Sequence, residues 1–145
     1  MIVVATDTEY ELAKERFENQ KILKTGIGAL NIAKTLKNYP KHIKITNFGY
    51  AGSNNIPKDT EVKVGTCKLY HPNVEYAEPE YNLNGDTPCY TSVDFVTSTK
   101  IKEPAVFDME LAFILGLGFT NVESIKIISD NLSLEEYKEK TNGTN

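Results

Sequence analysis

The chain has 145 residues, of which 40% are hydrophobic, and a formal net charge of −4. This length suits one domain with a substantial core, so we expect a single domain over residues 1–145. The acidic balance argues against a nucleic-acid partner, which would need basic patches. The apolar start is too short for a signal peptide and no run reaches transmembrane length, so we expect a cytoplasmic protein without membrane contact. Cys67 and Cys89 have no metal-ligand spacing, so we expect reduced structural thiols, no metal and no cofactor.

The first third of the chain alternates strands and helices. Short apolar runs that are typical of buried strands lie at residues 2–5, 22–25 and 43–48. Between them, residues 9–19 and 29–39 are expected to be helical, with Pro40 ending the second helix. This order predicts right-handed crossovers and a largely parallel sheet with helices on both faces. Ligands bind at the carboxyl ends of such strands, where the glycine-rich loops 26–28 and 49–55 lie.

The remainder of the chain predicts further elements of both kinds. The expected strands are 61–70, 89–97, 105–107 and 122–128, and the expected helices are 108–117 and 134–140, the latter begun by Ser133. Residues 71–88 are rich in Pro, Asn, Glu and Tyr and are expected to form a long loop, which in a compact domain is usually functional, an interface or disordered. Together these elements predict an α/β fold, a three-layer α-β-α sandwich around a central mixed, mostly parallel sheet.

Several short motifs have both a structural and a chemical interpretation. Asp108-Met109-Glu110 stands where a strand turns into a helix, a corner that can aim carboxylates into a pocket. The same residues can serve only as a helix cap and a first-turn acid. Glu9 and Ser129-Asp130 allow the same two interpretations. Gly26-Ile27-Gly28 by itself is a turn, and the glycines and alanine of 47–52 would let the backbone approach a flat ligand.

Taken together, the motifs resemble the nucleoside phosphorylase/nucleosidase superfamily. The order that carries the resemblance is Ala5-x-x-x-Glu9, Lys24-Thr25-Gly26-Ile27-Gly28, Asn47-x-Gly49-x-Ala51-Gly52, Ser92-Val93-Asp94-Phe95, Asp108-Met109-Glu110 and Ile128-Ser129-Asp130. The set looks most like the branch of methylthioadenosine/S-adenosylhomocysteine nucleosidases and futalosine hydrolases. The chain resembles a shortened form, without the early hairpin and without the helix that normally precedes the strand at Ser92.

The resemblance implies that three carboxylates carry the chemistry. Asp130 would protonate a purine at N7, Glu110 would bind the ribose hydroxyls, and Glu9 would activate water, with Glu11 as the alternative in another register. The resemblance also implies the surrounding binding residues, which are Ser129 beside the acid, Phe95 and Val96 at the base, Ala51 and Gly52 along its plane, Met109 against the sugar, and Ile27 and Gly28 below the ribose. Breaking an N-glycosidic bond builds positive charge on the sugar and negative charge on the base, so acids of separate pKa can serve both ends.

The chain departs from the family pattern at two positions. Tyr50 stands where the family commonly has a small residue and is expected to fill the region of the water or of the 5′ substituent. Lys126 stands where these nucleosidases often have arginine. The Tyr70-His71 segment resembles one that meets a neighbouring subunit, so a homodimer or a higher homo-oligomer is expected. Tyr76 and Tyr81 are open to two interpretations, as the lining of a 5′ pocket or as surface and interface tyrosines.

The scarcity of arginine bears on the reaction. Phosphate pockets usually contain arginines, because the guanidinium fork matches phosphate oxygens, and Arg16 is the only arginine of the chain. We therefore expect hydrolysis of a purine nucleoside, 5′-modified forms included, to free base and ribose. Two alternatives stay open: a phosphorylase that uses Lys24, Thr25 and backbone N–H groups, and a catalytically inactive nucleoside-binding or assembly protein.

Overall fold

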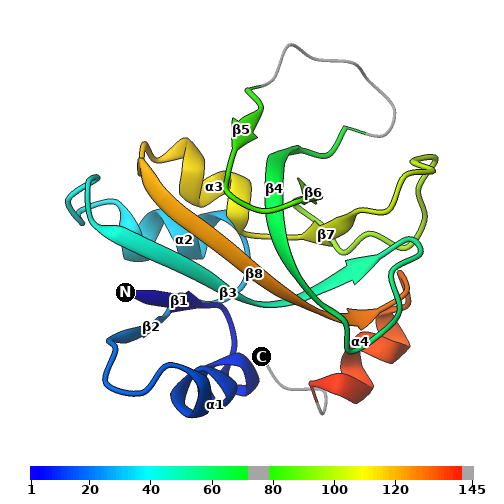
Figure 1. Cartoon of the computed structure of the whole chain (residues 1–145), viewed down its shortest axis with the longest axis horizontal. Helices are drawn as coiled ribbons and strands as arrows, with labels where there is room; N and C mark the ends of the chain where they lie inside the picture. Colours follow the sequence, from blue (N-terminus) through cyan, green and yellow to red (C-terminus); the bar gives the residue numbers. More distant parts are fainter. Residues whose placement is uncertain (72–78, 142–145) are drawn as a thin grey trace.

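An eight-stranded mixed sheet forms the centre of the computed structural model, which describes residues 1–71 and 79–141 (Figure 1). Its strands are β1 (Ile2–Val4), β2 (Ile22–Lys24), β3 (Lys44–Ser53), β4 (Glu61–Leu69), β5 (Tyr81–Asn82), β6 (Thr87–Thr91), β7 (Val106–Asp108) and β8 (Asn121–Asp130). The helices of the described chain are α1 (Asp7–Arg16), α2 (Ala29–Leu36), α3 (Leu111–Gly116) and α4 (Leu134–Lys140). None of these helices is long and apolar enough to cross a membrane.

The first part of the sheet is parallel, as the alternation of strands and helices predicts. β1 pairs in parallel with both β2 and β3, and β3 pairs in parallel with β8 along most of its length. All three residues of β1 are buried, because helices cover the sheet on either side of it. The ends of β1, β3 and β8 therefore point the same way, and the residues that follow these strands meet at one edge.

The predicted α/β class and mixed central sheet are confirmed, but the rest of the sheet closes into a barrel, so the predicted three-layer sandwich is wrong. β8 pairs with β4, β4 with β6, β6 with β7, and β7 returns to the end of β3. The ring is possible because β3 and β8 are long and the register between them shifts between Ala51 and Gly52. Closure of a ring removes sheet edges, and its pairings join residues far apart in the sequence, which local patterns do not reveal.

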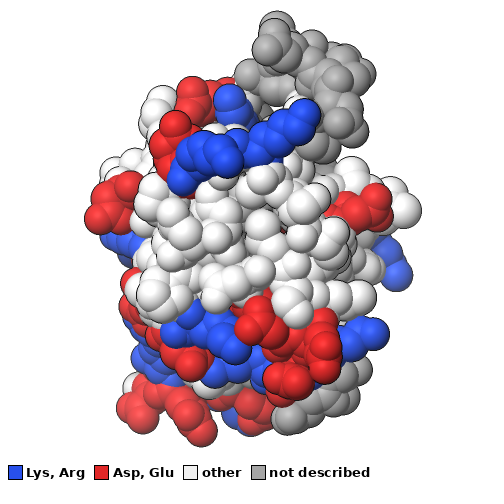
Figure 2. All heavy atoms as spheres, turned by 90° about the vertical axis from the view of Figure 1, so that its right-hand side faces the viewer, with Lys and Arg blue, Asp and Glu red and all other residues white. Residues whose placement is uncertain are grey.

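Three buried apolar clusters hold the helices on the sheet and fill the barrel. α1 contributes Ala13 to the first, and α2 and α3 contribute Ile32 and Ile114 to the second. The third fills the barrel interior and contains Cys67 and Cys89, which are buried free thiols as predicted. Figure 2 shows the face at the right of Figure 1, where a band of uncharged side chains lies between two charged rims.

Several elements differ from the predicted ones. The predicted loop 71–88 contains β5 and the first residues of β6, and the predicted helices 9–19 and 29–39 end at Arg16 and Leu36. Further differences concern β3, β6 and α3. β3 continues to Ser53 where a loop was predicted from Gly49, because its last residues pair with β7 and β8. The predicted strand 89–97 ends at Thr91, and the chain then runs without regular structure to Ala105. α3 begins at Leu111 instead of Asp108, because Asp108 is still the last residue of β7.

Candidate active site

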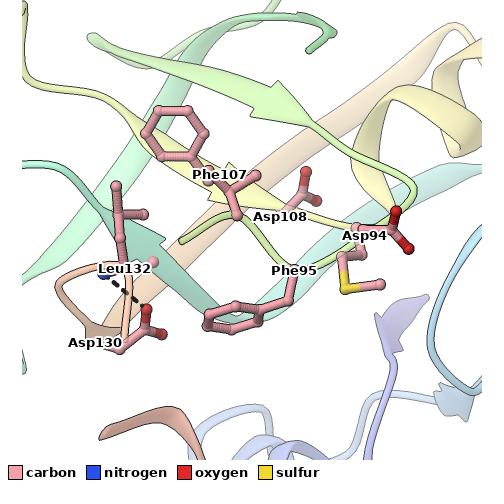
Figure 3. A pocket seen from close by; sticks show the side chains of 9 residues that line it. Asp94, Phe95, Phe107, Asp108, Asp130 and Leu132 are labelled. Atoms are coloured by element: carbon pink, nitrogen blue, oxygen red, sulfur yellow. Dashed lines mark hydrogen bonds between the residues drawn. The ribbon is translucent and has the colours of Figure 1, made fainter. Parts of the chain in front are cut away.

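Asp130 lies buried at the end of β8, in a pocket that contains several of the predicted residues (Figure 3). Its Oδ1 accepts a hydrogen bond from Ser129 Oγ at 2.6 Å and its Oδ2 accepts one from the Leu132 N–H at 3.0 Å. The pocket is lined by Gly52, Asp94, Phe95, Val96, Phe107, Asp108, Met109, Asp130 and Leu132. The structure thus brings the predicted Gly52, Phe95, Val96 and Met109 to the predicted acid.

The pocket around Asp130 is narrow in this structure. Its free volume is about 20 Å³, which is room for about one water molecule. Figure 3 shows the ring of Phe95 reaching toward Asp130 across the pocket. Phe95 belongs to the irregular stretch between β6 and β7, and its ring takes up part of the space beside Asp130.

The environment of Asp130 favours its protonated form. Burial raises the pKa of the carboxyl, although the Ser129 hydroxyl and the Leu132 N–H lower it in part. Gly52 lies against the carboxylate, and a Cβ added there would come within 2.8 Å of Asp130 Oδ2. The glycine is therefore needed for Asp130 to hold this position, which explains one of the two glycines in the 47–52 motif.

Glu110 joins the Gly26-Ile27-Gly28 turn to the start of α3. Its Oε2 accepts a hydrogen bond from the Gly28 N–H at 2.8 Å, and Gly28 has a φ of 90°, which favours glycine. Burial, followed by the negative charge of Asp108, raises the pKa of Glu110 to about 8. The two motifs are 82 residues apart in the sequence, and this hydrogen bond places them on one side of the site.

Glu9 is held by three backbone groups at the start of α1. Its Oε1 accepts from the N–H groups of Ala5 at 2.8 Å and Thr6 at 3.2 Å, and its Oε2 accepts from the Tyr50 N–H at 2.8 Å. Glu9 also has the structural role predicted for it as an acid in the first turn of a helix, because its side chain forms a capping box with Thr6 at the start of α1. Burial is the main cause that raises its pKa. Glu11, the alternative in another register, is exposed and pairs with Lys14 at 3.3 Å.

The second glycine of the 47–52 motif packs against Glu9. A Cβ added to Gly49 would lie 2.5 Å from Glu9 Oε2, so a side chain there would displace the carboxylate. Each of the two motif glycines therefore makes room for a different predicted acid. Both glycines lie inside β3 and not in a flexible loop. Their role is therefore to leave space for the two carboxylates, and not to give the backbone freedom.

Lys126 provides a buried positive charge among the acids. It is 1% exposed, and its Nζ lies 3.2 Å from Asp108 Oδ2. Burial alone would raise the pKa of Asp108, but the Lys126 ammonium and the Thr91 hydroxyl, which donates to Asp108 Oδ1 at 2.5 Å, hold this pKa below its usual value. Burial alone would lower the pKa of Lys126, but the neighbouring anionic groups, Asp108 first, raise it. The lysine therefore stays charged.

Some of the other predicted residues lie near the Asp130 pocket, and others lie in the core or at a separate hollow. Ser129 Oγ also lies 3.4 Å from the carbonyl oxygen of Ala51, whose side chain packs in the barrel core and does not line the pocket. The Ile27 carbonyl accepts from Asn31 Nδ2, which fixes the turn below Gly28. Tyr81 lines a separate apolar hollow of about 440 Å³ between α2 and α3. Tyr76 lies outside the described residues.

Two features of the site were not predicted. The burial of Lys126 has a sequence signal in retrospect, since a lone lysine inside the apolar strand 122–128 is unusual unless it is paired. Tyr137 of α4, which the sequence indicates only as a helical residue, has its ring 5.5 Å from that of Phe95, measured between centroids. No group of three or more His, Cys, Asp or Glu side chains in the described part of the chain could hold a metal ion.

Comparison with known proteins identifies the fold. No family model and no curated protein sequence matches this chain. Among solved structures, an MTAN from Chlamydia trachomatis bound to MTA superposes with a TM-score of 0.79 at 16% identity, over 97% of this chain and 88% of that one. An S-adenosylhomocysteine nucleosidase from Streptococcus pyogenes gives 0.76 at 14% identity, over 99% and 89%. The chain has the nucleosidase fold.

A solved structure with a different activity name, a futalosine hydrolase, also has this fold. A futalosine hydrolase of Helicobacter pylori superposes with a TM-score of 0.72 at 14% identity, over 99% of this chain and 88% of that chain. The fold-level resemblance drawn from the motifs is therefore confirmed. At these identities the likeness concerns the fold, and the chemistry rests on the residues of this chain.

Proposed function

We propose that this protein hydrolyses the N-glycosidic bond of a purine nucleoside and releases the free base and ribose. One observation carries the proposal: Glu9 and Asp130 both pack against β3, at Gly49 and Gly52, and Met109, the neighbour of Glu110, lines the pocket of Asp130. Glycosidic cleavage needs acids at both ends of the breaking bond. Proteins of the same fold are nucleosidases, and one of them binds MTA, which agrees with a nucleoside substrate.

At the base end, Asp130 acts as the general acid. Its pKa is raised by burial, so it carries a proton closer to neutral pH than an exposed aspartate does. Donation of this proton to N7 of the purine lets the base leave as a neutral molecule. Ser129, whose hydroxyl donates to the carboxyl at 2.6 Å, keeps the acid oriented toward the pocket, and Phe95 lies against the base once its ring has moved.

At the sugar end, the carboxylates stabilise the positive charge that develops on the ribose. Glu110 accepts the 2′ and 3′ hydroxyls, with Gly28 fixing one carboxylate oxygen, and Met109 packs against the ring. Glu9 takes a proton from the attacking water. Burial raises the pKa of both glutamates, and the ammonium of Lys126 opposes this rise in part. Hydrogen bonds that the ribose hydroxyls donate to Glu110 favour its ionised form when the substrate binds.

Water is favoured over phosphate because the cations that could bind phosphate have other partners. Lys24 Nζ lies 2.5 Å from Asp7, and Arg16 pairs with Glu61 on the molecular surface. The Thr25 hydroxyl donates to backbone carbonyls of Val4 and Gly26. A phosphate dianion beside Glu9 and Glu110 would therefore meet two carboxylates with little compensation, whereas water needs only a base.

The finer predictions from the resemblance remain part of this proposal. We propose a homodimer or a higher homo-oligomer in the cytoplasm, acting in purine metabolism, and sedimentation or light scattering of the pure protein tests the assembly. The proposal covers adenine and hypoxanthine alike, since N7, the atom that Asp130 protonates in it, is common to both purines.

One assay separates the proposal from its two alternatives. The pure protein is incubated with adenosine, inosine and methylthioadenosine, each with and without phosphate, and base release is followed by chromatography. Base without phosphate supports the hydrolase, and base only with phosphate supports the phosphorylase. Binding of nucleoside without any base release supports an inactive binding protein and contradicts the proposal.

A further inference from the structure

The corner between β7 and α3 contains two carboxylates with different partners. Asp108 is the last residue of β7, and Glu110 is the N-cap residue of α3. An N-cap side chain ordinarily accepts hydrogen bonds from the first N–H groups of its helix. Instead of capping α3, Glu110 accepts through Oε2 from the Gly28 N–H at 2.8 Å. The capping of α3 therefore depends on other groups.

Asp108 and a threonine of the neighbouring strand supply the acceptors that α3 needs at its start. Asp108 Oδ2 accepts from the Leu111 N–H at 2.7 Å. Thr91 Oγ1, at the end of β6, accepts from the Ala112 N–H at 3.0 Å. The two N–H groups that follow bond to the backbone carbonyl of Glu110. The first turn of α3 is thus satisfied without the Glu110 carboxylate, which leaves that carboxylate available for a ligand.

Asp108 also holds the buried ammonium of Lys126. Nζ of this lysine, on β8, lies 3.2 Å from Asp108 Oδ2, and among the described residues Asp108 is the one carboxylate that pairs with it. Burial lowers the pKa of Lys126, and anionic groups, Asp108 first and Glu110 among them, raise it. A buried charge without a partner is costly, so an ammonium that lost Asp108 would draw another carboxylate toward it.

The Asp108 carboxylate is fully used by the protein. Its Oδ1 accepts from the Thr91 hydroxyl at 2.5 Å and from the Cys89 thiol at 3.4 Å, while Oδ2 serves Lys126 and the start of α3. A carboxylate offers about four acceptor sites, so these donors leave little capacity for a ligand. Figure 3 shows the carboxylate pointing away from Asp130, although Asp108 lines the same pocket. Asp108 is therefore suited to act through its neighbours.

We propose that Asp108 is a positioning residue for the sugar carboxylate: it caps α3 in place of Glu110 and retains Lys126, so that Glu110 can face the ribose hydroxyls. This inference rests on the proposed function, in which Glu110 accepts those hydroxyls. Removing the charge of Asp108 should let the Glu110 carboxylate leave Gly28 and turn toward Lys126.

The first test determines the position of Glu110 without any nucleoside. Crystal structures of the wild type and of Asp108→Asn are compared, because asparagine keeps an acceptor for the α3 N–H groups and removes only the charge. In the variant, Glu110 Oε2 should lie beyond hydrogen-bond distance of the Gly28 N–H and within about 4 Å of Lys126 Nζ. If Asp108→Asn does not fold, Thr91→Val, which loosens Asp108 by one hydroxyl, should move Glu110 in the same direction by less.

The second test measures whether Asp108 acts through Glu110. Asp108→Asn should narrow the adenosine/2′-deoxyadenosine ratio of kcat/KM by about three- to tenfold, as expected when a hydrogen bond to Glu110 is weakened. In the Glu110→Gln background, the same substitution should leave the ratio at its Glu110→Gln value. If Asp108 were only structural, both nucleosides would lose activity equally and the ratio would not change.

Ile114→Val is the matched control for stability. Ile114 lies on α3, in the cluster between α2 and α3, and its side chain is away from the corner. The variant should lower the unfolding temperature by about 2–6 °C and leave both the Glu110 position and the nucleoside ratio unchanged. An equal change of the ratio in Ile114→Val and Asp108→Asn would overturn the positioning role.

The two tests separate this inference from the proposed function. If the wild type binds nucleosides and releases no base, the hydrolase proposal fails, and the Glu110 position and the affinity ratio from calorimetry still decide the role of Asp108. A Glu110 carboxylate that stays on Gly28 in both Asp108→Asn and Thr91→Val, or an effect of Asp108→Asn that persists in the Glu110→Gln background, overturns it. Failure of the wild type to bind either nucleoside overturns both proposals.

Discussion

The base end and the sugar end of the candidate site both bury carboxylates, but only one end contains a buried cation. At the base end, Asp130 accepts hydrogen bonds from the neutral Ser129 and Leu132 groups, and burial raises its pKa. At the sugar end, the ammonium of Lys126 opposes the effect of burial on Glu9 and Glu110. Lys126 offsets the effect of burial at the sugar end only in part, since the pKa of Glu9 stays raised and that of Glu110 lies at about 8. The two ends therefore differ in the groups around the acids, which are neutral donors at Asp130 and an ammonium beside the glutamates.

The largest expected effect comes from removing the proton at the base end. Asp130→Asn should lower kcat/KM for adenosine by about 10²- to 10⁴-fold, since general acid catalysis contributes on that order. The loss should be much smaller with 7-methylinosine, whose base already carries a positive charge and needs no proton at N7. Equal losses on the two substrates would show that Asp130 is structural, and the exposed Asp86→Asn serves as the charge-matched control.

Glu9→Gln is the corresponding change at the sugar end. Turnover should fall by about 10²-fold with little change in substrate affinity, because the base acts on water and not on the bound nucleoside. Its loss should be the same for adenosine and 7-methylinosine, unlike that of Asp130→Asn. Because three backbone N–H groups donate to Glu9, the variant should also lose about 1–3 kcal/mol of stability. Glu11→Gln, exposed on the same helix, should affect neither quantity.

Features that depend on residues close together in the sequence could be predicted, and features that depend on residues far apart in the sequence could not. The strands, the helix caps at Thr6 and Ser133, and the order of the motifs are local, and the structure contains them. The barrel depends on pairings such as β3 with β7 and β4 with β8, which no short pattern specifies. A prediction from periodicity therefore gives most of the elements but neither the short strand β5 nor the closure of the sheet.

The candidate site shows the same division. Glu9, Glu110 and Asp130 were predicted because the order of the motifs resembles the nucleosidase family; their positions at strand ends and helix starts alone left a structural interpretation open. Their surroundings were not predicted, because Lys126 reaches Asp108 from a different strand, and Tyr137 meets Phe95 only through the placement of α4. Side-chain partners of this kind come from tertiary packing.

A smaller effect is expected from Glu110→Gln. A carboxylate that accepts both ribose hydroxyls should make adenosine a better substrate than 2′-deoxyadenosine by roughly 10- to 100-fold, since a hydrogen bond to a charged group contributes about 1.5–3 kcal/mol. Glu110→Gln should lower adenosine activity and narrow this ratio, which kcat/KM for the two nucleosides measures. A ratio that the substitution leaves unchanged would remove Glu110 from the sugar site.

The smallest expected effect is the pH dependence of nucleoside binding, which tests whether Glu110 accepts the ribose hydroxyls. Burial and Asp108 raise the pKa of Glu110 to about 8 in the empty site, and ribose hydroxyls that donate to it favour the ionised form. Binding should therefore release protons below pH 8, so the affinity for adenosine rises with pH, at most tenfold per unit, and levels off above pH 8. Calorimetry in buffers of different ionisation enthalpy measures the release, and Glu110→Gln should abolish the part of it that Glu110 contributes.

The identity of the sugar product tests the central claim most directly. Wild-type protein is incubated with adenosine in the presence of phosphate, and the products are separated by ion-exchange chromatography. The account predicts adenine and free ribose, in amounts that do not change when phosphate is left out, because Lys24 and Arg16 are paired elsewhere and water is the nucleophile. Accumulation of ribose 1-phosphate would contradict it and would place Lys24 and Thr25 in a phosphate site.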